Sequence, residues 1–163
     1  MGEFDYVWAN PRQAARRAFE AVNTHARVTL QTLTEDIATA TRKPIEIREL
    51  PELGQWGTSA HWFELPDLHL ILESAPTSEH HQHWVRMHEL GHIVFTHLGW
   101  TATPPHALTG HGGLSLADAA RLHRANFRLP SEQAAEEFAR HADLMIRVGR
   151  GGTLDNDYSV VLS

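Results

Sequence analysis

The sequence predicts a small α+β domain, and three observations indicate this class. Helix-forming residues fill most of the stretch before Pro44, and short apolar stretches separated by turns follow it. Three further helical segments come after these stretches. We therefore expect N-terminal helices, a short antiparallel sheet, and a central helix that packs against a later helix.

A length of 163 residues suits a single domain over 1–163. We divide it into an N-terminal helical region (1–43), a core (44–148) and a C-terminal tail (149–163). The formal net charge of −6 argues against direct contact with nucleic acid, which needs a basic face. The sequence shows no apolar run long enough to cross a membrane and no secretory leader, so we expect a cytoplasmic protein.

The first helical segment begins at Asn10, because Pro11 then occupies the first helical position. Apolar residues keep a helical period over 15–37, which fits either one long helix or two helices with a break near Asn23. Pro44 ends this region, since the residue before a proline disfavours helix.

Three short stretches after Pro44 have the pattern of strands. Ile45–Leu50 alternates apolar and charged residues, as a half-buried strand does. Thr58–Leu65 and His69–Leu72 lie on either side of a turn at Pro66, so we expect them to form a hairpin.

The stretch Thr77–Leu98 predicts the central helix, with an N-cap at Thr77 or Ser78 and an end at Gly99. Its second half is apolar on nearly every side, which is typical of a buried helix. That half contains the sequence HELGH, in which His88 and His92 are four residues apart and point the same way. Two imidazoles and a carboxylate inside a buried helix need a reason, and metal binding supplies one.

After the central helix we expect a loop, a short helix, a longer helix with Ser131 as its N-cap, and a final short strand. These segments are, in order, Gly99–Gly113, Ser115–Arg124, Ser131–Val148 and Tyr158–Leu162. The loop is long enough to border a cleft.

HELGH matches the HExxH pattern of zinc enzymes. Two neutral imidazoles one turn apart reach one tetrahedral zinc ion, and Glu89 between them faces a water on that ion. The ion lowers the pKa of the water, and Glu89 takes its proton and passes it to the leaving amine. The chain has no cysteine, so its ligands must be histidines and carboxylates. It also has 13 histidines, so the alternative is an accidental match that contains two partly buried core histidines.

A catalytic zinc usually takes three protein ligands, and two carboxylates compete for the third place. Asp155 ends the sequence GTLD, which resembles a GTxD ligand pattern but lies in a glycine-rich tail. Glu132 lies in the first turn of an otherwise apolar helix, with Glu136 on the same face. We favour Glu132 as the ligand and Glu136 as the acceptor that orients one of the histidines, with Asp155 as the alternative ligand. Candidates for the group that stabilises the oxyanion are His106, His111, His123, His141 and Tyr158.

The order of these segments resembles the ImmA/IrrE family of metallo-endopeptidases. The resemblance covers roughly 44–145 and rests on Pro44–Pro51, His69–Leu72, HELGH, and a later E-x-x-A-x-x-F-A pattern formed by Glu132, Ala135, Phe138 and Ala139. It implies a small zincin-like domain of the gluzincin type with one zinc ion and Glu132 as its third ligand. It also implies a peptidase that acts on a protein partner, often a helix-turn-helix repressor that it cleaves or inactivates.

A second hypothesis is that the protein has this fold but does not catalyse peptide hydrolysis. The family usually has Asn or Asp at the position of Glu136, and the segment between Gly99 and Pro130 is long. These two features are compatible with a catalytically inactive zincin-like protein that regulates by binding a partner.

Overall fold

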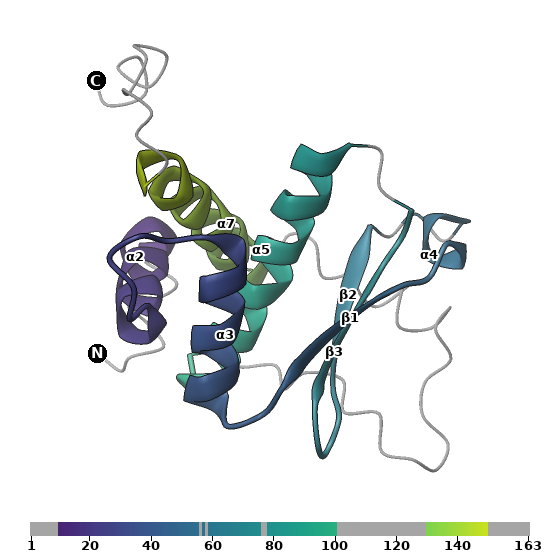
Figure 1. The fold of residues 1–163 in the computed structure, drawn as a ribbon, viewed down its shortest axis with the longest axis horizontal. Helices are drawn as coiled ribbons and strands as arrows, with labels where there is room; N and C mark the ends of the chain where they lie inside the picture. Colours follow the sequence, from purple (N-terminus) through teal and green to yellow (C-terminus); the bar gives the residue numbers. More distant parts are fainter. Residues whose placement is uncertain (1–9, 56, 58, 76–77, 101–129, 150–163) are drawn as a thin grey trace.

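A computed structural model of the chain describes residues 10–55, 57, 59–75, 78–100 and 130–149 (Figure 1). Within these residues the fold is α+β, as expected, with five helices and a three-stranded sheet. The helices are α2 (Pro11–Val22), α3 (Leu30–Thr41), α4 (Glu52–Gln55), α5 (Glu79–His97) and α7 (Pro130–Gly149). The strands are β1 (Ile45–Glu49), β2 (Ala60–Glu64) and β3 (His69–Glu73). None of these described helices has the length and apolar character that crossing a membrane requires.

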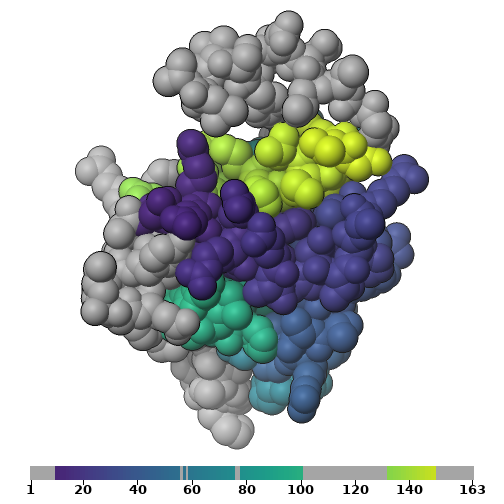
Figure 2. All heavy atoms as spheres, turned by 90° about the vertical axis from the view of Figure 1, so that its left-hand side faces the viewer, coloured from purple at the N-terminus to yellow at the C-terminus, as the bar shows by residue number. Residues whose placement is uncertain are grey.

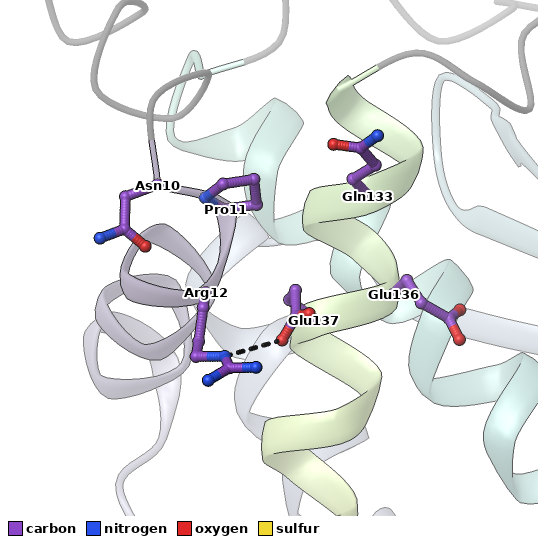
Figure 3. Close-up of a pocket in the computed structure, with 6 residues that line it drawn as sticks. All are labelled: Asn10, Pro11, Arg12, Gln133, Glu136 and Glu137. Carbon is purple, nitrogen blue, oxygen red and sulfur yellow. Dashed lines mark ion pairs between the residues drawn. The ribbon is translucent and has the colours of Figure 1, made fainter. Parts of the chain in front are cut away.

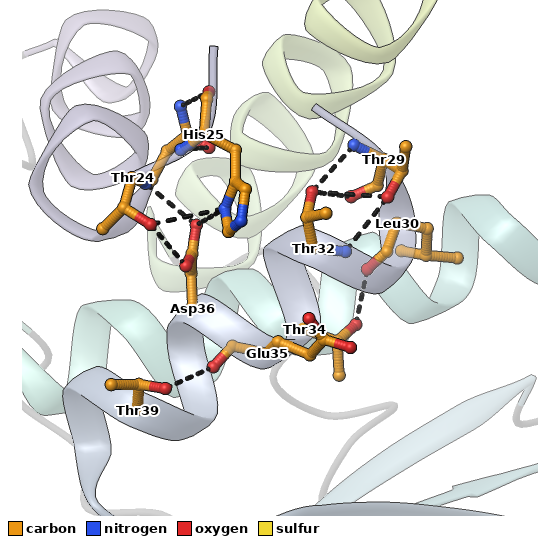
Figure 4. Close-up of polar contacts among 10 residues, drawn as sticks. Thr24, His25, Thr29, Leu30, Thr32, Thr34, Glu35, Asp36 and Thr39 are labelled. Carbon is orange, nitrogen blue, oxygen red and sulfur yellow. Dashed lines mark hydrogen bonds and ion pairs between the residues drawn. The ribbon is translucent and has the colours of Figure 1, made fainter. Parts of the chain in front are cut away.

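The first helical region forms two helices, which decides between the alternatives that the sequence left open. α2 ends at Val22 because Asn23 takes an extended backbone conformation. The buried carboxylate of Asp36 on α3 then fixes the connection (Figure 4). It accepts hydrogen bonds from the Thr24 backbone N–H at 2.9 Å and from Thr24 Oγ1 at 2.7 Å, and it lies 3.0 Å from His25 Nδ1. These contacts satisfy the polar groups where the chain leaves α2.

The sheet is mixed rather than antiparallel, which corrects the expectation from the sequence. Its strand order is β1-β3-β2, so the last of the three described strands lies in the middle. β2 and β3 form the expected antiparallel hairpin, with Trp62 opposite Ile71. β1 pairs with β3 in parallel, with Ile47 opposite Ile71. After β1 the chain passes through α4 to β2 at the opposite edge of the sheet, and then returns to the middle as β3. β3 is therefore antiparallel to β2 and parallel to β1.

A buried histidine joins the sheet to α3. His69 on β3 is 4% exposed, and its Nδ1 accepts a hydrogen bond from the Trp62 indole N–H at 3.2 Å. An indole nitrogen can only donate, so the proton of a neutral His69 is on Nε2, which lies 3.2 Å from Thr41 Oγ1. Burial, with the positive charge of Lys43, lowers the pKa of His69 to about 4. The ring is therefore neutral and connects β3, β2 and α3.

α5 lies between the sheet on one side and α2 and α7 on the other (Figure 1). α7 packs against both α5 and α2, and Figure 2 shows α2 and α7 side by side on one face of the molecule. At the centre of this packing the Phe138 ring lies 6.1 Å from that of Phe19 and 6.3 Å from that of Phe95. α7 begins at Pro130, one residue before the expected N-cap at Ser131, because proline suits the first helical position. The expected segments within 101–129 and after 149 lie outside the described residues.

Candidate metal centre

HELGH lies in the second half of α5, as expected. Ser78 caps this helix, because its Oγ accepts a hydrogen bond from the His81 N–H at 3.1 Å. The ring centroids of His88 and His92 are 4.9 Å apart, and their Nε2 atoms are 3.2 Å apart. Both imidazoles therefore present Nε2 to the same point.

The third group at this point comes from α7. The Glu132 carboxylate is 9% exposed and spans the two rings, with Oε2 at 2.9 Å from His88 Nε2 and Oε1 at 3.0 Å from His92 Nε2. Each of these three residues offers one ligand atom, and the three atoms lie within 4.8 Å of one another. The structure thus brings together the ligand set that the sequence favoured. Asp155, the alternative third ligand, lies outside the described residues.

The donor set of this cluster fits zinc. Two imidazole nitrogens and a carboxylate oxygen are zinc ligands, and ligands about 2.0–2.1 Å from a tetrahedral ion lie roughly 3.3 Å from one another. The three contacts in the cluster, of 2.9, 3.0 and 3.2 Å, are close to that spacing. Three protein ligands leave a fourth position open, which is the arrangement of catalytic rather than structural zinc sites.

Hydrogen bonding dominates the electrostatics of the cluster. Burial lowers the pKa of His88, but hydrogen bonds with Glu132 and Glu136 outweigh burial and raise that pKa to about 10. Burial likewise raises the pKa of Glu132, yet its bonds with both histidines hold that pKa far below its usual value. The Glu132 carboxylate is therefore ionised, and a proton on His88 balances it. A bound cation would displace that proton, so metal affinity should rise with pH.

Glu136, one turn after Glu132, contacts the other nitrogen of the His88 ring. Its Oε2 lies 3.2 Å from His88 Nδ1. Hydrogen bonding from His88, opposed by burial, lowers the pKa of Glu136 and keeps it ionised. An ionised carboxylate can only accept, so His88 donates its Nδ1–H and keeps Nε2 directed at the cluster. This is the geometry of an acceptor that orients a metal ligand.

The remaining acid of HELGH is Glu89, which is 4% exposed. Its negative charge is one of the causes that raise the pKa of His88. A buried carboxylate in the same helical turn as two metal ligands has the chemistry of a general base towards water.

Gly91 allows the two ligand-bearing helices to approach closely. A Cβ at Gly91 would lie 3.1 Å from Phe138 Cβ and 3.2 Å from two carbons of its ring. Because Phe138 is fully buried on α7, this contact sets how near α7 comes to α5, and hence the reach of Glu132. A glycine inside a helix lowers the stability of the helix by about 1 kcal/mol relative to alanine. A glycine at this position of HELGH is therefore the feature of the sequence that indicates a close contact between helices.

A buried ion pair fixes the first half of α5 to the sheet. Glu73, at the end of β3, is 3% exposed and accepts hydrogen bonds from Arg86 Nε at 2.9 Å, Arg86 Nη2 at 2.6 Å and Gln82 Nε2 at 3.0 Å. The pair was not expected from the sequence, because its members are 13 residues apart on different elements and no local period links them. It positions the helix that carries His88 and His92.

The other described histidines form no second group of metal ligands. His141 on α7 packs edge-on against Phe19, with ring centroids 4.9 Å apart, so it contacts α2. His80 and His83 lie in the polar first half of α5, where they neighbour Trp84 and Glu79. The remaining candidates for the oxyanion group, which lie outside the described residues, are His106, His111, His123 and Tyr158.

Comparison of the chain with protein-family models, with curated proteins and with solved structures finds no match. The chemistry available at the cluster therefore has to be argued from its own residues. They provide three groups that could hold one cation, a buried carboxylate in the same HELGH sequence and an acceptor that orients one of the histidines.

Proposed function

We propose that this protein is a zinc-dependent metallo-endopeptidase, with His88, His92 and Glu132 as ligands and Glu89 as general base. The observation that carries the proposal is the position of the Glu132 carboxylate, at 2.9 Å from one histidine of HELGH and 3.0 Å from the other. An accidental HELGH would not require a buried carboxylate, 44 residues after its first histidine, to span both rings.

Bound zinc would supply Lewis acidity, which lowers the pKa of a water and polarises the carbonyl of a peptide bond. Glu89 would take the proton of the attacking water and deliver it to the leaving amine. Glu136 would hold His88 in the tautomer that presents Nε2 to the cluster. The low exposure of Glu89 and Glu132 keeps bulk water away, which strengthens the electrostatic interactions within the site.

The proposed substrate is a protein regulator, such as a helix-turn-helix repressor. This part depends on the resemblance of the segment order, HELGH and the E-x-x-A-x-x-F-A pattern to the ImmA/IrrE family. The packing is compatible with that pattern, because Ala135, Phe138 and Ala139 are all fully buried. A role in transcription would then run through the partner rather than through direct contact with DNA.

Metal content and cleavage test the two parts of the proposal separately. Purified protein should contain one zinc ion per chain, and Glu132→Gln should lose it. Glu137→Gln is the matched control, because Glu137 lies on the same helix but pairs with Arg140, and this variant should keep the zinc. Glu89→Gln should keep the zinc and abolish cleavage, scored as new protein N-termini in cells that produce the wild type.

Two other outcomes would redirect the proposal. A Glu89→Gln protein that keeps both its zinc and its biological activity would favour a catalytically inactive zincin-like regulator. A purified wild-type protein without zinc, whose stability does not change in chelator, would contradict both functions and favour an accidental HELGH.

A further inference from the structure

A polar groove lies next to the candidate metal centre. It has a volume of about 310 Å³ and lies between the start of α2 and the first turns of α7 (Figure 3). Its lining residues are Asn10, Pro11, Arg12, Gln133, Glu136 and Glu137. Glu136 belongs to both places, since it lines the groove and its carboxylate lies 3.2 Å from His88 Nδ1. Glu136 therefore marks the border between the metal centre and the groove.

The α2 side of the groove has an excess of positive charge. Two guanidinium groups compete for the Glu137 carboxylate: Arg140 Nη1 donates to Oε1 at 2.8 Å, whereas Arg12 Nε lies 3.6 Å from Oε2. The longer distance is that of an ion pair without a hydrogen bond (Figure 3). Two guanidinium groups therefore share one carboxylate, which leaves one positive charge in excess. The Arg12 side chain is 64% exposed, which leaves its guanidinium accessible to a ligand.

Glu136, on the other side of the groove, does not cancel this charge. Figure 3 shows its side chain directed away from Arg12, and its carboxylate contacts His88 instead. Asn10 and Gln133 add neutral amides to the lining. The groove therefore offers an exposed guanidinium that is held only by a long ion pair and lies beside neutral polar groups.

We propose that this groove binds an acidic side chain of the peptide substrate and that Arg12 is the residue that selects it. The inference rests on the proposed function, because a peptide at the metal centre is what brings a side chain to the groove. A carboxylate matches a guanidinium both in charge and in the spacing of its paired acceptors. Because Arg12 is exposed, it sets a preference among peptides rather than most of the affinity.

Selection from a library of random peptides tests this inference without relying on cleavage. Zinc-loaded Glu89→Gln protein should enrich Asp and Glu at one position by about threefold to fivefold, the upper part of the range of an exposed ion pair. The double variant Glu89→Gln/Arg12→Glu should lose this enrichment or enrich Lys and Arg instead. Arg16→Glu in the same background is the matched control, because Arg16 lies one turn later on α2, is 67% exposed and pairs with Glu20. It should preserve the acidic preference.

The outcomes separate the inference from the proposed function. The role of Arg12 would be overturned if Glu89→Gln and Glu89→Gln/Arg12→Glu enriched acidic residues equally. It would also be overturned if neither protein enriched them. Loss of enrichment in both charge-reversal variants would do the same, because it would indicate an effect of net charge alone. Failure of the proposed function would look different, since wild-type protein would leave every selected peptide uncut while the binding preference persisted.

Discussion

Replacement of Gly91 by alanine tests whether the close approach of α5 and α7 sets the geometry of the metal centre. The new Cβ would lie 3.1 Å from Phe138 Cβ, so Phe138 has to move by a few tenths of an ångström. Phe138 has little room to move, because it is fully buried and its ring contacts those of Phe19 and Phe95. We therefore expect α7 itself to shift away from α5.

Two opposing contributions set the stability of the Gly91→Ala protein. Alanine inside a helix favours the folded state by about 1 kcal/mol relative to glycine. Overpacking of a filled core costs about 1–3 kcal/mol. Because the space around Phe138 is filled, we expect the cost of overpacking to exceed the gain from alanine. The free energy of unfolding without metal should then fall by about 1 kcal/mol.

The effect of Gly91→Ala on zinc binding should be larger. Glu132 reaches the two histidines at 2.9 and 3.0 Å, and a shift of α7 lengthens both contacts. A misplaced ligand should weaken zinc binding about tenfold, the lower end of the effect of losing an orienting partner. Urea unfolding in chelator measures the stability, and competition with a chelator of known affinity measures the zinc binding.

Gly54→Ala is the matched control for this substitution. The atom nearest to its new Cβ would be Ser74 Cβ at 3.8 Å, which is an ordinary contact, so zinc affinity should stay at the wild-type value. If Gly91→Ala is more stable than wild type and binds zinc equally well, the close contact with Phe138 does not set the position of Glu132, and the reasoning is wrong.

Three further predictions address the groups around the cluster. Glu136→Gln should weaken zinc binding by about 10–100-fold in chelator competition, because the first histidine of HELGH loses its charged acceptor. Glu73→Gln should lower the free energy of unfolding by about 2–3 kcal/mol in urea, since it leaves Arg86 without its buried partner, whereas Glu46→Gln in an exposed pair should have no measurable effect. His69 has a folded pKa of about 4 against an ordinary 6.5, so the stability that it contributes is complete above pH 6.5 and is lost as pH falls towards 4. Between pH 7 and 4.5 this loss should be about 2.5 kcal/mol, and a His69→Gln variant should lack that part of the pH dependence.

Local patterns in the sequence were sufficient to predict most of the candidate site. A spacing of four residues directs His88 and His92 to one side of a helix whatever surrounds them, and the structure has their Nε2 atoms 3.2 Å apart. The same rule relates Glu132 to Glu136 on α7. That these two helices face each other was an inference from the buried character of both, and the contacts of Glu132 with the histidines confirm it.

Features that depend on pairing between distant segments were not predictable in this way. Alternation in Ile45–Leu50 indicates which side chains share a face, but it does not specify the neighbour or direction of a strand, so the parallel pairing of β1 was missed. The contacts of Glu73 with Arg86 and of Gly91 with Phe138 also join separate elements. Asp155 remains a prediction that the described residues do not test.

Both proposals depend on α7, but they depend on different residues of it. Glu132 and Glu136 contact His88 on α5, whereas Glu137 pairs with Arg12 on α2 across the groove. A change that moves α7 as a whole should therefore alter zinc affinity and peptide preference together. A change confined to α2, such as Arg12→Glu, should alter peptide preference and leave zinc affinity unchanged, because that residue makes no contact with the ligands. The two measurements on one set of variants thus distinguish a displaced helix from a changed groove.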